Sequence, residues 1–537
     1  MNGDALEELL GDPYDGSNPT GHAAIIAADD AGEPCAAGEA VLDAWQANAE
    51  YVPAELGGRL TAVDELVRRL RPVFRRDAGL GLGHGLTTLM ASLNVWAAGT
   101  AEQRKHLAGR LLAGERVSVA YHELEHGNDL TRNALRAERR GNGFVLDGTK
   151  RVINNAGRAR AAVVFARTAD PAAAPGGRDH SLLFVDDLDR VPGLTRLPRL
   201  RTSGLAGCLL AGFGFDGAVV GEDALVGAVG TGAETALRSF QVSRCVTAGV
   251  GTSLLEGALF GVYRFATERV LYGRPVTAIP HARSVLAGAF IDLQVAQALA
   301  RVAARALHLY PSVAGRYAAA AKYLAPKITE NALADLAVVL GARGYLREGE
   351  YAFVGKHLRD IAGLSIGHAG GVSCQLTVLP DLPGVRPTGA EGALFDDSPL
   401  PELDLGELRM RAGRADPLLG ALEGVADDEL RAELASVRAD AAALPVTERG
   451  VTASHRSLAL TERYAWLLAA SACLNSPRAA DPQWTDAVLE RIGLRSGRTT
   501  ERTSTAALDA AYQDMADRAA TGRSFDLDPE PVLRALA

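Results

Sequence analysis

The stretch DLAVVLGARGYLREGEYAFVGKHLRDIAGLSIGHAGGVSC, residues 335–374, decides the fold of this chain. It begins as an apolar helix and breaks at residues 341–345 (GARGY). It then reaches the pair Arg359-Asp360 and ends in the glycine-rich turn 367–371 (GHAGG). Glycine adopts positive φ without strain and lets a backbone come close to a ligand. Helix interrupted twice by such turns is typical of a chain that approaches a bound ligand twice.

Composition and charge describe an ordinary globular protein. A chain of 537 residues is longer than one hydrophobic core normally serves, so about two to four domains are expected. Apolar residues make up 47% and charged residues 23%, which is the balance of a globular chain. The net charge of −9 argues against a nucleic-acid partner, which needs a basic footprint, and against adhesion to anionic lipid.

The cysteines and the N-terminus indicate a cytoplasmic protein. The five cysteines are odd in number and scattered, which predicts neither a disulfide framework nor a metal site and fits a reducing compartment. Residues 1–16 are acidic and lack the apolar core of a signal peptide. No run of eighteen apolar residues occurs, so we expect no membrane span.

The hydrophobic period changes along the first half of the chain. Residues 1–117 show apolar positions at helical spacing, which predicts an N-terminal helical domain. Residues 118–227 contain short β-branched or aromatic runs separated by Gly and Asn turns. These predict a small antiparallel β domain.

Helix returns in the second half. Residues 228–380 hold long Ala-rich segments with wide apolar faces, which predict a C-terminal four-helix bundle. Prolines mark a linker at 381–401, and 402–537 has the pattern of charged amphipathic helices in an extra helical domain. The expected fold class is therefore α+β, mostly α.

Two motifs in the β region resemble loops of the acyl-CoA dehydrogenase family. YHELEHGND, residues 121–129, resembles Leu-Thr-Glu-Pro-x-Ala-Gly-Ser-Asp, the loop that covers the flavin and the acyl thioester; Asn128 replaces the Ser. GTKRVINNA, residues 148–156, resembles Gly-x-Lys-x-Trp-Ile-Thr-Asn, whose Trp and Thr pack against the isoalloxazine. Val152 and Asn154 stand at those two places.

Two motifs in the bundle resemble the same family. ERVLYGRPV, residues 268–276, is similar to Glu-Arg-x-x-Phe-Gly-x-Pro-Ile, whose Arg binds the FAD pyrophosphate. Arg269 fits this role because its planar fork pairs two phosphate oxygens; the alternative is an ordinary solvated arginine. The opening stretch resembles the Leu-Gly-Gly-x-Gly-Tyr turn, the Arg-Asp pair and the loop Ile-x-Glu-Gly-Thr. Only the last is altered, because His368 stands at the place of the Glu.

The resemblance, which covers roughly residues 40–375, implies FAD as cofactor. The cofactor-binding residues that it implies are Tyr121, Glu123, Asn128, Val152, Ile153, Asn154, Arg269, Tyr272, Gly341 and Gly344. No metal is expected: the His and Glu residues of 122–126 would alternate between the two faces of a strand, and the sequence offers no second ligand cluster.

The identity of the catalytic base is open. The family keeps a Glu either in the late loop, here His368, or before an Arg in an earlier bundle helix, here Ser243 before Arg244. An imidazole with a pKa of about 6.5 is a competent base at neutral pH, so His368 is the candidate catalytic residue. The alternatives are that His368 only lines an altered loop, or that a carboxylate such as Glu123 or Glu348 serves.

By resemblance, the reaction is FAD-dependent α,β-dehydrogenation of an acyl thioester on CoA or a carrier protein, with hydride transfer to flavin N5. Electrons would leave through an electron-transferring flavoprotein or another acceptor, and the chain would form a homodimer or homotetramer. A flavin monooxygenase or biosynthetic tailoring enzyme of the same fold is one alternative. A non-catalytic acyl-binding or scaffold protein is the other.

Overall fold

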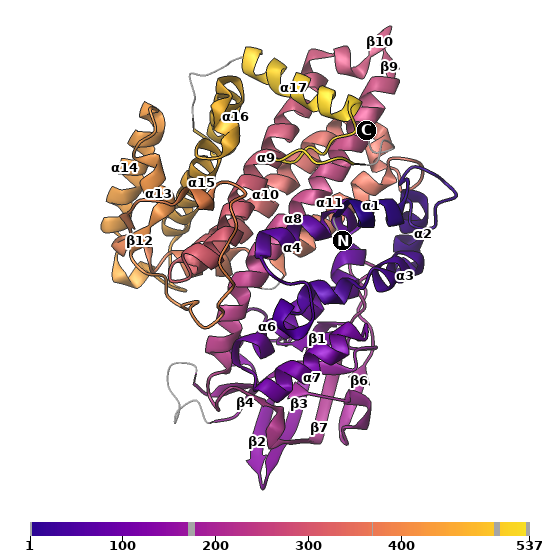
Figure 1. Cartoon of the computed structure of the whole chain (residues 1–537), viewed down its shortest axis with the longest axis vertical. Helices are drawn as coiled ribbons and strands as arrows, with labels where there is room; N and C mark the ends of the chain where they lie inside the picture. Colours follow the sequence, from indigo (N-terminus) through magenta and orange to yellow (C-terminus); the bar gives the residue numbers. More distant parts are fainter. Residues whose placement is uncertain (1–2, 170–177, 368, 499–504, 533–537) are drawn as a thin grey trace. The chain divides into compact units, whose positions relative to one another are not determined.

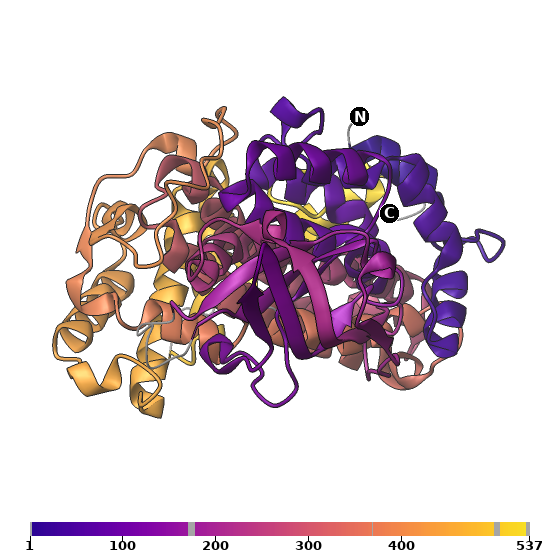
Figure 2. The ribbon, with the colours of Figure 1, turned by 90° about the horizontal axis from the view of Figure 1, so that it is seen from below.

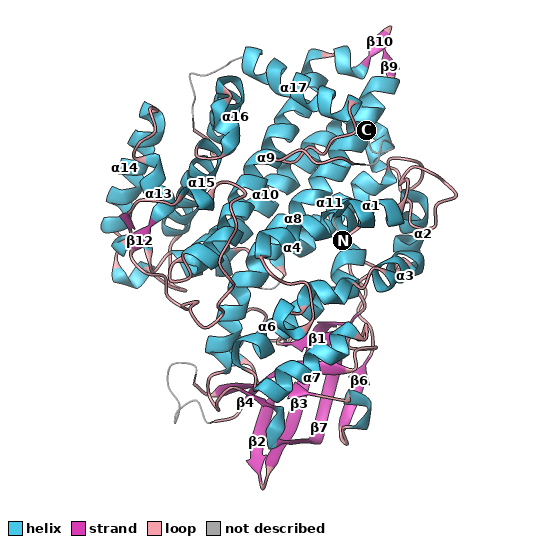
Figure 3. Cartoon of the chain, viewed as in Figure 1, coloured by secondary structure: helices cyan, strands magenta, loops and turns pink. Residues whose placement is uncertain are grey.

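The computed structural model describes residues 3–169, 178–367, 369–498 and 505–532. They divide into two compact units, each described by itself. The helical unit comprises Met1–Ile26, Ala62–Ala78 and Arg244–Ala537, and the sheet unit comprises Ala27–Thr61 and Gly79–Ser243. Figure 1 follows the chain through both by colour, and Figure 3 shows that the long strands are gathered in the sheet unit.

The sheet unit is built on an eight-stranded sheet with the order β6-β7-β3-β2-β4-β5-β8, to which β1 adds by pairing with β4. Figure 2 shows these strands from below. The strands are β1 (Val117–Ala120), β2 (Arg136–Arg140), β3 (Gly143–Asn154), β4 (Ala161–Arg167), β5 (His180–Val185), β6 (Leu194–Leu197), β7 (Leu210–Gly221) and β8 (Leu225–Val226). Strands β4 and β5 are nearly continuous apolar runs and are buried on both faces, which fixes them in the middle of the core.

Most neighbouring strands are antiparallel, as the Gly and Asn turns predict. The exception is β1, which runs parallel to β4 with Val117 opposite Ala161; β2 also meets β4 in parallel at one residue pair. A strand can pair in parallel because β1 and β4 are far apart in sequence, and a two-residue hairpin cannot impose the antiparallel sense on them. Local turn signals therefore predicted the hairpins but not this pairing.

The helices of the sheet unit include a turn that the sequence did not indicate. They are α3 (Ala36–Ala44), α5 (Ala78–Gly81), α6 (Thr87–Ala98) and α7 (Ala101–Leu112). The glycine-rich run 79–85 predicts a bend, but the helix continues through it as a π-helical turn, Leu82–Leu86, that joins α5 to α6. Close packing explains the glycine at 85, because a Cβ there would lie 2.6 Å from the Tyr51 ring.

The helical unit holds the expected bundle. Its four long helices are α8 (Gly232–Glu268), α9 (Pro280–Leu309), α10 (Ala314–Leu340) and α11 (Ala352–Ile366); α8 is divided between the two units at Ser243/Arg244. Helix α4 (Val63–Arg76) packs closely on α8, since a Cβ at Gly249 would lie 2.6 Å from Val67. The short elements at the bundle ends are α1 (Gly3–Leu10), α2 (His22–Ala31, divided between the units), β9 (Val270–Leu271), β10 (Arg274–Pro275) and α12 (Val372–Val378).

Helices α8 and α9 are long and apolar enough to cross a membrane by length and composition alone. In the part of the chain that the structure describes, 100% of the most apolar window of α8 and 89% of that of α9 are buried inside the protein. Core helices of bundles have this character, so these two helices are weak evidence for a membrane span.

The C-terminal extension packs on the bundle. It contains β11 (Arg386–Pro387), β12 (Ala415–Asp416), α13 (Pro417–Leu422), α14 (Asp428–Ala442), α15 (His455–Leu474), α16 (Pro482–Arg495) and α17 (Thr505–Ala520). The buried carboxylate of Asp416 joins the two parts by accepting hydrogen bonds of 2.6 Å from the hydroxyls of Tyr317 on α10 and Tyr464 on α15. Arg316 on α10 donates to Tyr464 Oη over 2.9 Å. The extension and the bundle therefore share one polar core.

Candidate functional site

The loop between β1 and β2, residues 121–135, carries the first motif. Its start and end are buried, while Leu124 and Asn128 near its tip are exposed. The Tyr121 side chain is fully buried and donates from its hydroxyl to Asn94 Oδ1 over 2.6 Å. The Glu123 carboxylate accepts from Lys150 Nζ at 2.8 Å and from the backbone N–H groups of Ala134 and Leu135.

The polar atoms of the Tyr121 and Glu123 side chains are thus bonded within the protein, and their contact with a cofactor stays a prediction. Each has its polar atoms engaged inside the sheet unit, which gives both a structural role. Burial lowers the pKa of Lys150 to about 8 against the raising effect of Glu123, while Lys150 and the hydrogen bonds outweigh burial and lower the pKa of Glu123. Sequence reasoning passed over Lys150, although a lysine among strand residues at the head of the second motif is a visible signal of a buried ion pair.

The second motif ends strand β3 in an irregular backbone. The register of β3 against β7 shifts between Arg151 and Ile153, and Val152 in this bulge has φ of 59° with 37% of its surface exposed. Positive φ is a genuine outlier for a β-branched residue, and such strain gathers at functional sites. Ile153 is buried in the core of the sheet unit.

Asn154 is held to the π-helical turn. Its Nδ2 donates to the carbonyl of Leu82 at 3.1 Å and to Thr87 Oγ1 at 2.8 Å, while its Oδ1 is buried without a hydrogen-bond partner among the described residues. The bulged end of β3 is therefore fixed to the start of α6, with Val152 as its exposed residue.

The third and fourth motifs lie together at one end of the bundle in the helical unit. Arg343 stacks 5.8 Å from the Phe265 ring, and Arg264 pairs with Glu350 at 3.0 Å, so the 341–351 segment contacts the end of α8. Tyr272, 92% exposed, and Gly341 both have positive φ, and Gly344 is partly exposed. The β9–β10 hairpin that follows α8 is exposed throughout.

This bundle end carries arginines without acidic partners. Arg269 and Arg274 are exposed, and among the described residues neither forms an ion pair, whereas most arginines of the chain do. Arg343 adds a third guanidinium, which stacks on the Phe265 ring. Unpaired guanidinium groups beside a glycine turn suit a phosphate or diphosphate ligand. Arg274 and Arg343 were not assigned to the cofactor site from the sequence. Each lies inside a motif in which other residues, Arg269 and the glycines Gly341 and Gly344, were assigned that role.

The late loop is tied to α8. His368 lies outside the described residues, but its neighbour Ala369 has a φ of 55° and a carbonyl that accepts from Arg244 Nη2 at 3.3 Å and from Cys374 Sγ at 3.3 Å. Arg244 also donates to Thr377 Oγ1 at 3.3 Å, and the buried Lys322 donates to the carbonyl of Leu364. Burial lowers the pKa of Lys322 to about 8.

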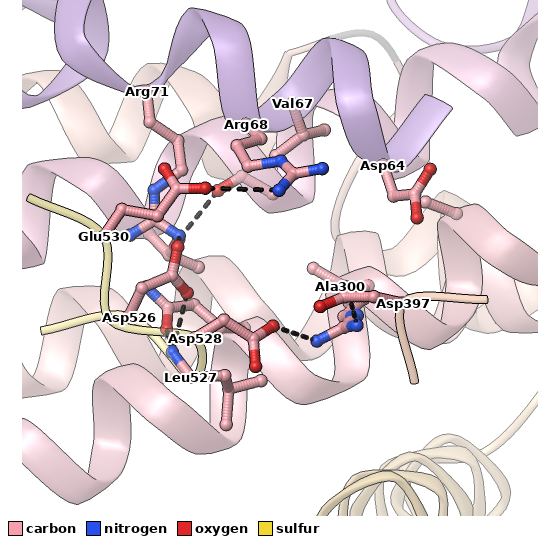
Figure 4. A pocket seen from close by; sticks show the side chains of 15 residues that line it. Asp64, Val67, Arg68, Arg71, Ala300, Asp397, Asp526, Leu527, Asp528 and Glu530 are labelled. Carbon is pink, nitrogen blue, oxygen red and sulfur yellow. Dashed lines mark hydrogen bonds and ion pairs between the residues drawn. The ribbon is translucent and has the colours of Figure 1, made fainter. Parts of the chain in front are cut away.

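A separate pocket, partly open to solvent, lies where the C-terminal segment crosses α4, α8 and α9 (Figure 4). Its charged side chains pair with one another: Arg68 with Glu530, Arg71 with Asp526, and Arg301 with both Asp397 and Asp528. Because these charges are already compensated, this pocket offers no free group for proton or hydride chemistry.

Two segments of the chain match models of known protein families. Residues 118–218 match the model of the acyl-CoA dehydrogenase middle domain, and residues 230–375 match that of the acyl-CoA dehydrogenase C-terminal domain. The chain therefore carries the middle and C-terminal domains of the acyl-CoA dehydrogenase family. The four motifs therefore lie within family domains, and the fold class expected from the sequence is confirmed.

Individual relatives agree with the family. An acyl-CoA dehydrogenase of Bacillus subtilis (strain 168) is 27% identical over 298 residues, covering 55% of this chain and 77% of the relative. A 3-sulfinopropanoyl-CoA desulfinase of Cupriavidus necator is 25% identical over 329 residues, covering 60% and 80%. The structure of butyryl-CoA dehydrogenase from Megasphaera elsdenii, 20% identical, matches the fold with a TM-score of 0.63 over 70% of this chain and 96% of the other.

Members of this family are FAD-dependent oxidoreductases acting on CH–CH bonds, and the residues of this chain fit that cofactor. The unpaired guanidinium groups of Arg269 and Arg274 suit the diphosphate. Within the sheet unit, Val152 is exposed in a strained bulge of β3. Within the helical unit, Gly341 has open space around its Cα. When bound, FAD supplies the acceptor for a hydride.

Proposed function

We propose that this acyl-CoA dehydrogenase family member removes the α and β hydrogens of an acyl thioester carried by CoA or by a carrier protein. The observation that supports it is the bond from Arg244 to Ala369. The family keeps its base either just before the Arg of this helix or in the late loop, and Arg244 links these two places in this chain. Neither position holds a Glu in this chain, where Ser243 and His368 stand instead, and Arg244 and Ala369 are their neighbours in the sequence.

In this proposal the imidazole of His368 takes the α-proton. The side chain can do so at neutral pH because a neutral imidazole has a free ring lone pair. Arg244 and Cys374 hold the adjoining carbonyl of Ala369 and so set the direction of the loop. In the helical unit, Arg269 and Arg274 would bind a cofactor diphosphate. In the sheet unit, the bulge at Val152 would pack on a flavin ring.

The partners follow from the same proposal. Electrons would pass to an electron-transferring flavoprotein or another acceptor. The end of the bundle exposes large apolar side chains beside its unpaired arginines, and these would be covered in a homo-oligomer. The exposed apolar residues are Val270, Leu271, Tyr272, Tyr345 and Leu346.

The first test is an anaerobic titration of the purified protein with a panel of acyl-CoA and acyl-carrier-protein thioesters. A yellow protein whose flavin absorption bleaches with one thioester supports dehydrogenation. His368→Ala should then slow flavin reduction by ~10²–10⁴-fold without releasing FAD, and His368→Glu should recover much of the rate. Equal reduction rates for wild type and His368→Ala would remove His368 from the mechanism.

A second candidate is other chemistry on the same scaffold, as in a flavin monooxygenase or biosynthetic tailoring enzyme. It is favoured by the loss of Glu at both usual positions and by the relative named as a desulfinase. A yellow protein that no thioester bleaches, but that consumes oxygen when supplied with reduced flavin or NADPH, would support this second candidate. A colourless protein that cannot be reconstituted with FAD would instead indicate a non-catalytic member.

A further inference from the structure

Lys150 is a fully buried lysine on β3, two residues before the strained Val152. Its ammonium donates three hydrogen bonds, to the Tyr121 carbonyl at 3.2 Å, to Glu123 Oε1 at 2.8 Å and to Asn133 Oδ1. An ammonium has three donors, so the group is satisfied completely. All three acceptors belong to the loop 121–135, near its two ends.

Glu123 completes the connection from the loop side. Its Oε2 accepts from the N–H of Ala134 at 2.7 Å, and its Oε1 accepts from the N–H of Leu135 at 3.0 Å as well as from Lys150. The carboxylate therefore joins the third residue of the loop to its last two. Two buried charges, one from the strand and one from the loop, close the loop with five hydrogen bonds.

The tip of the loop has less anchoring: Arg167 on β4 donates from Nη2 to the carbonyl of Thr131 at 3.0 Å. Residues 124–132 make mainly short-range contacts within the tip, such as Asp129 N–H to His126 O and Arg132 N–H to Asp129 O, and Leu124, Asn128 and Arg132 are exposed. With few buried contacts of its own, the tip takes its position from the two ends of the loop. The contacts of Lys150 and Glu123 therefore hold both ends of the loop to β3, while Arg167 holds the carbonyls of Thr131 and Asn133.

We propose that Lys150 and Glu123 are positioning residues that lock the loop 121–135 to strand β3, so that the loop tip and the Val152 bulge form one preorganised wall of the flavin and thioester site. The proposal rests on the proposed function, because it concerns the same site. In this proposal both residues act through the backbone that they hold. Preorganisation lowers the cost in conformational entropy that the binding free energy must offset.

The test compares five proteins: wild type, Lys150→Met, Lys150→Arg, Glu123→Gln, and the control Lys327→Met. Lys327 is a suitable control because it also pairs with a glutamate, Glu462, but on the surface of the helical unit. The first readout is the rate of tryptic cleavage after Arg132, followed by mass spectrometry and compared with cleavage after the exposed Arg409. The second is the dissociation constant and midpoint potential of bound FAD.

We expect Lys150→Met and Glu123→Gln to raise cleavage after Arg132 by about tenfold or more, since the tip loses its anchored ends. They should also weaken FAD binding by about tenfold and shift the flavin potential. Lys150→Arg, which keeps the charge and the donors, should recover part of both effects, and Lys327→Met should change neither. A residue that only stabilised the fold would lower the unfolding temperature but leave the affinity and potential of the folded holoenzyme unchanged.

Unchanged cleavage after Arg132 in Lys150→Met would overturn the proposal. If this variant does not fold, Asn133→Ala replaces it, because that change removes one acceptor and keeps the ion pair; an unaltered cleavage rate there has the same meaning. A wild-type protein that binds no FAD would contradict the proposed function, while the cleavage experiment would still decide whether Lys150 and Glu123 hold the loop.

Discussion

Arg244 and Ala369, 125 positions apart in the chain, are joined by a hydrogen bond of 3.3 Å from the guanidinium to the carbonyl. The same guanidinium reaches Thr377 on α12, so one buried side chain of α8 contacts the chain at both residue 369 and residue 377. The strained φ of Ala369 occurs at the point where Arg244 and Cys374 converge.

Replacing Arg244 by Lys should slow flavin reduction by about 10–100-fold, because an ammonium cannot reproduce the two divergent donors of the fork and a small misplacement of a reacting group is costly. The measurement is stopped-flow reduction by the best thioester. Arg238→Lys, on the same helix but paired with Glu234 near the surface, is the control and should be close to wild type. Equal rates for the two variants would show that the loop does not depend on Arg244.

Arg269→Gln should weaken FAD binding by ~10–100-fold, the loss of a charge-assisted hydrogen bond of about 1.5–3 kcal/mol, while the fold stays intact. Arg269 has no ion pair among the described residues, so its removal leaves no carboxylate uncompensated. Fluorescence titration of apoprotein with FAD measures the effect. Arg438→Gln removes a surface arginine of α14 that pairs with Glu423, and FAD affinity should not respond to it. An unchanged affinity of Arg269→Gln for FAD would show that Arg269 is an ordinary solvated arginine.

The buried imidazole of His357 predicts acid sensitivity. Burial, helped by Lys356, lowers the pKa of His357 from 6.5 to about 4. Between pH 6.5 and 4 the unfolded chain binds a proton at this ring and the folded chain does not, so stability falls as the pH falls, by about 3 kcal/mol across the window. His357→Gln should flatten the dependence of the unfolding temperature on pH in this range. The exposed His455→Gln serves as control, and identical slopes for both variants would contradict the assignment.

Asp416→Ala should destabilise the helical unit by about 3–5 kcal/mol, because it leaves the buried Arg316 guanidinium and two tyrosine hydroxyls without their carboxylate. Thermal unfolding measures the change. Asp428→Ala makes the same substitution at a carboxylate that is 94% exposed and pairs with Arg431, and it should cost under about 1 kcal/mol. If the two variants unfold alike, the extension does not share a core with the bundle.

Much of this structure could be predicted from the sequence, because its signals are local. Three long apolar segments near 232–270, 281–308 and 315–340 appear as α8, α9 and α10 within a few residues of their expected ends. The strand runs at 143 and 161 likewise begin β3 and β4. Helical and strand periods are properties of neighbouring residues, which is why they can be read without the fold.

The features that escaped prediction depend on distant partners or on strain. The Glu123 carboxylate was expected at a cofactor, but its main partner, Lys150, lies 27 positions further along the chain, and no spacing rule links them. Val152 takes a left-handed φ that its side chain disfavours, so local propensity points away from it. The glycines of 79–85 predicted a ligand-facing or helix-joining bend, and the structure has a π turn there, in which Gly85 packs closely against the Tyr51 ring.

The C-terminal segment has a consequence for the order of folding during synthesis. Phe525 is completely buried, stacks on Phe260 at 3.9 Å, and donates from its N–H to the buried Glu256 of α8. The helical unit therefore recruits residues from both the first thirty positions and position 525. Phe525 packs between Phe260 on α8 and Phe290 on α9. Until residue 525 has been synthesised, these two rings lack the ring that covers them, although all strands of the sheet unit have been synthesised. A nascent chain that ends before residue 525 would therefore expose these two aromatic rings, and a chaperone could bind it there.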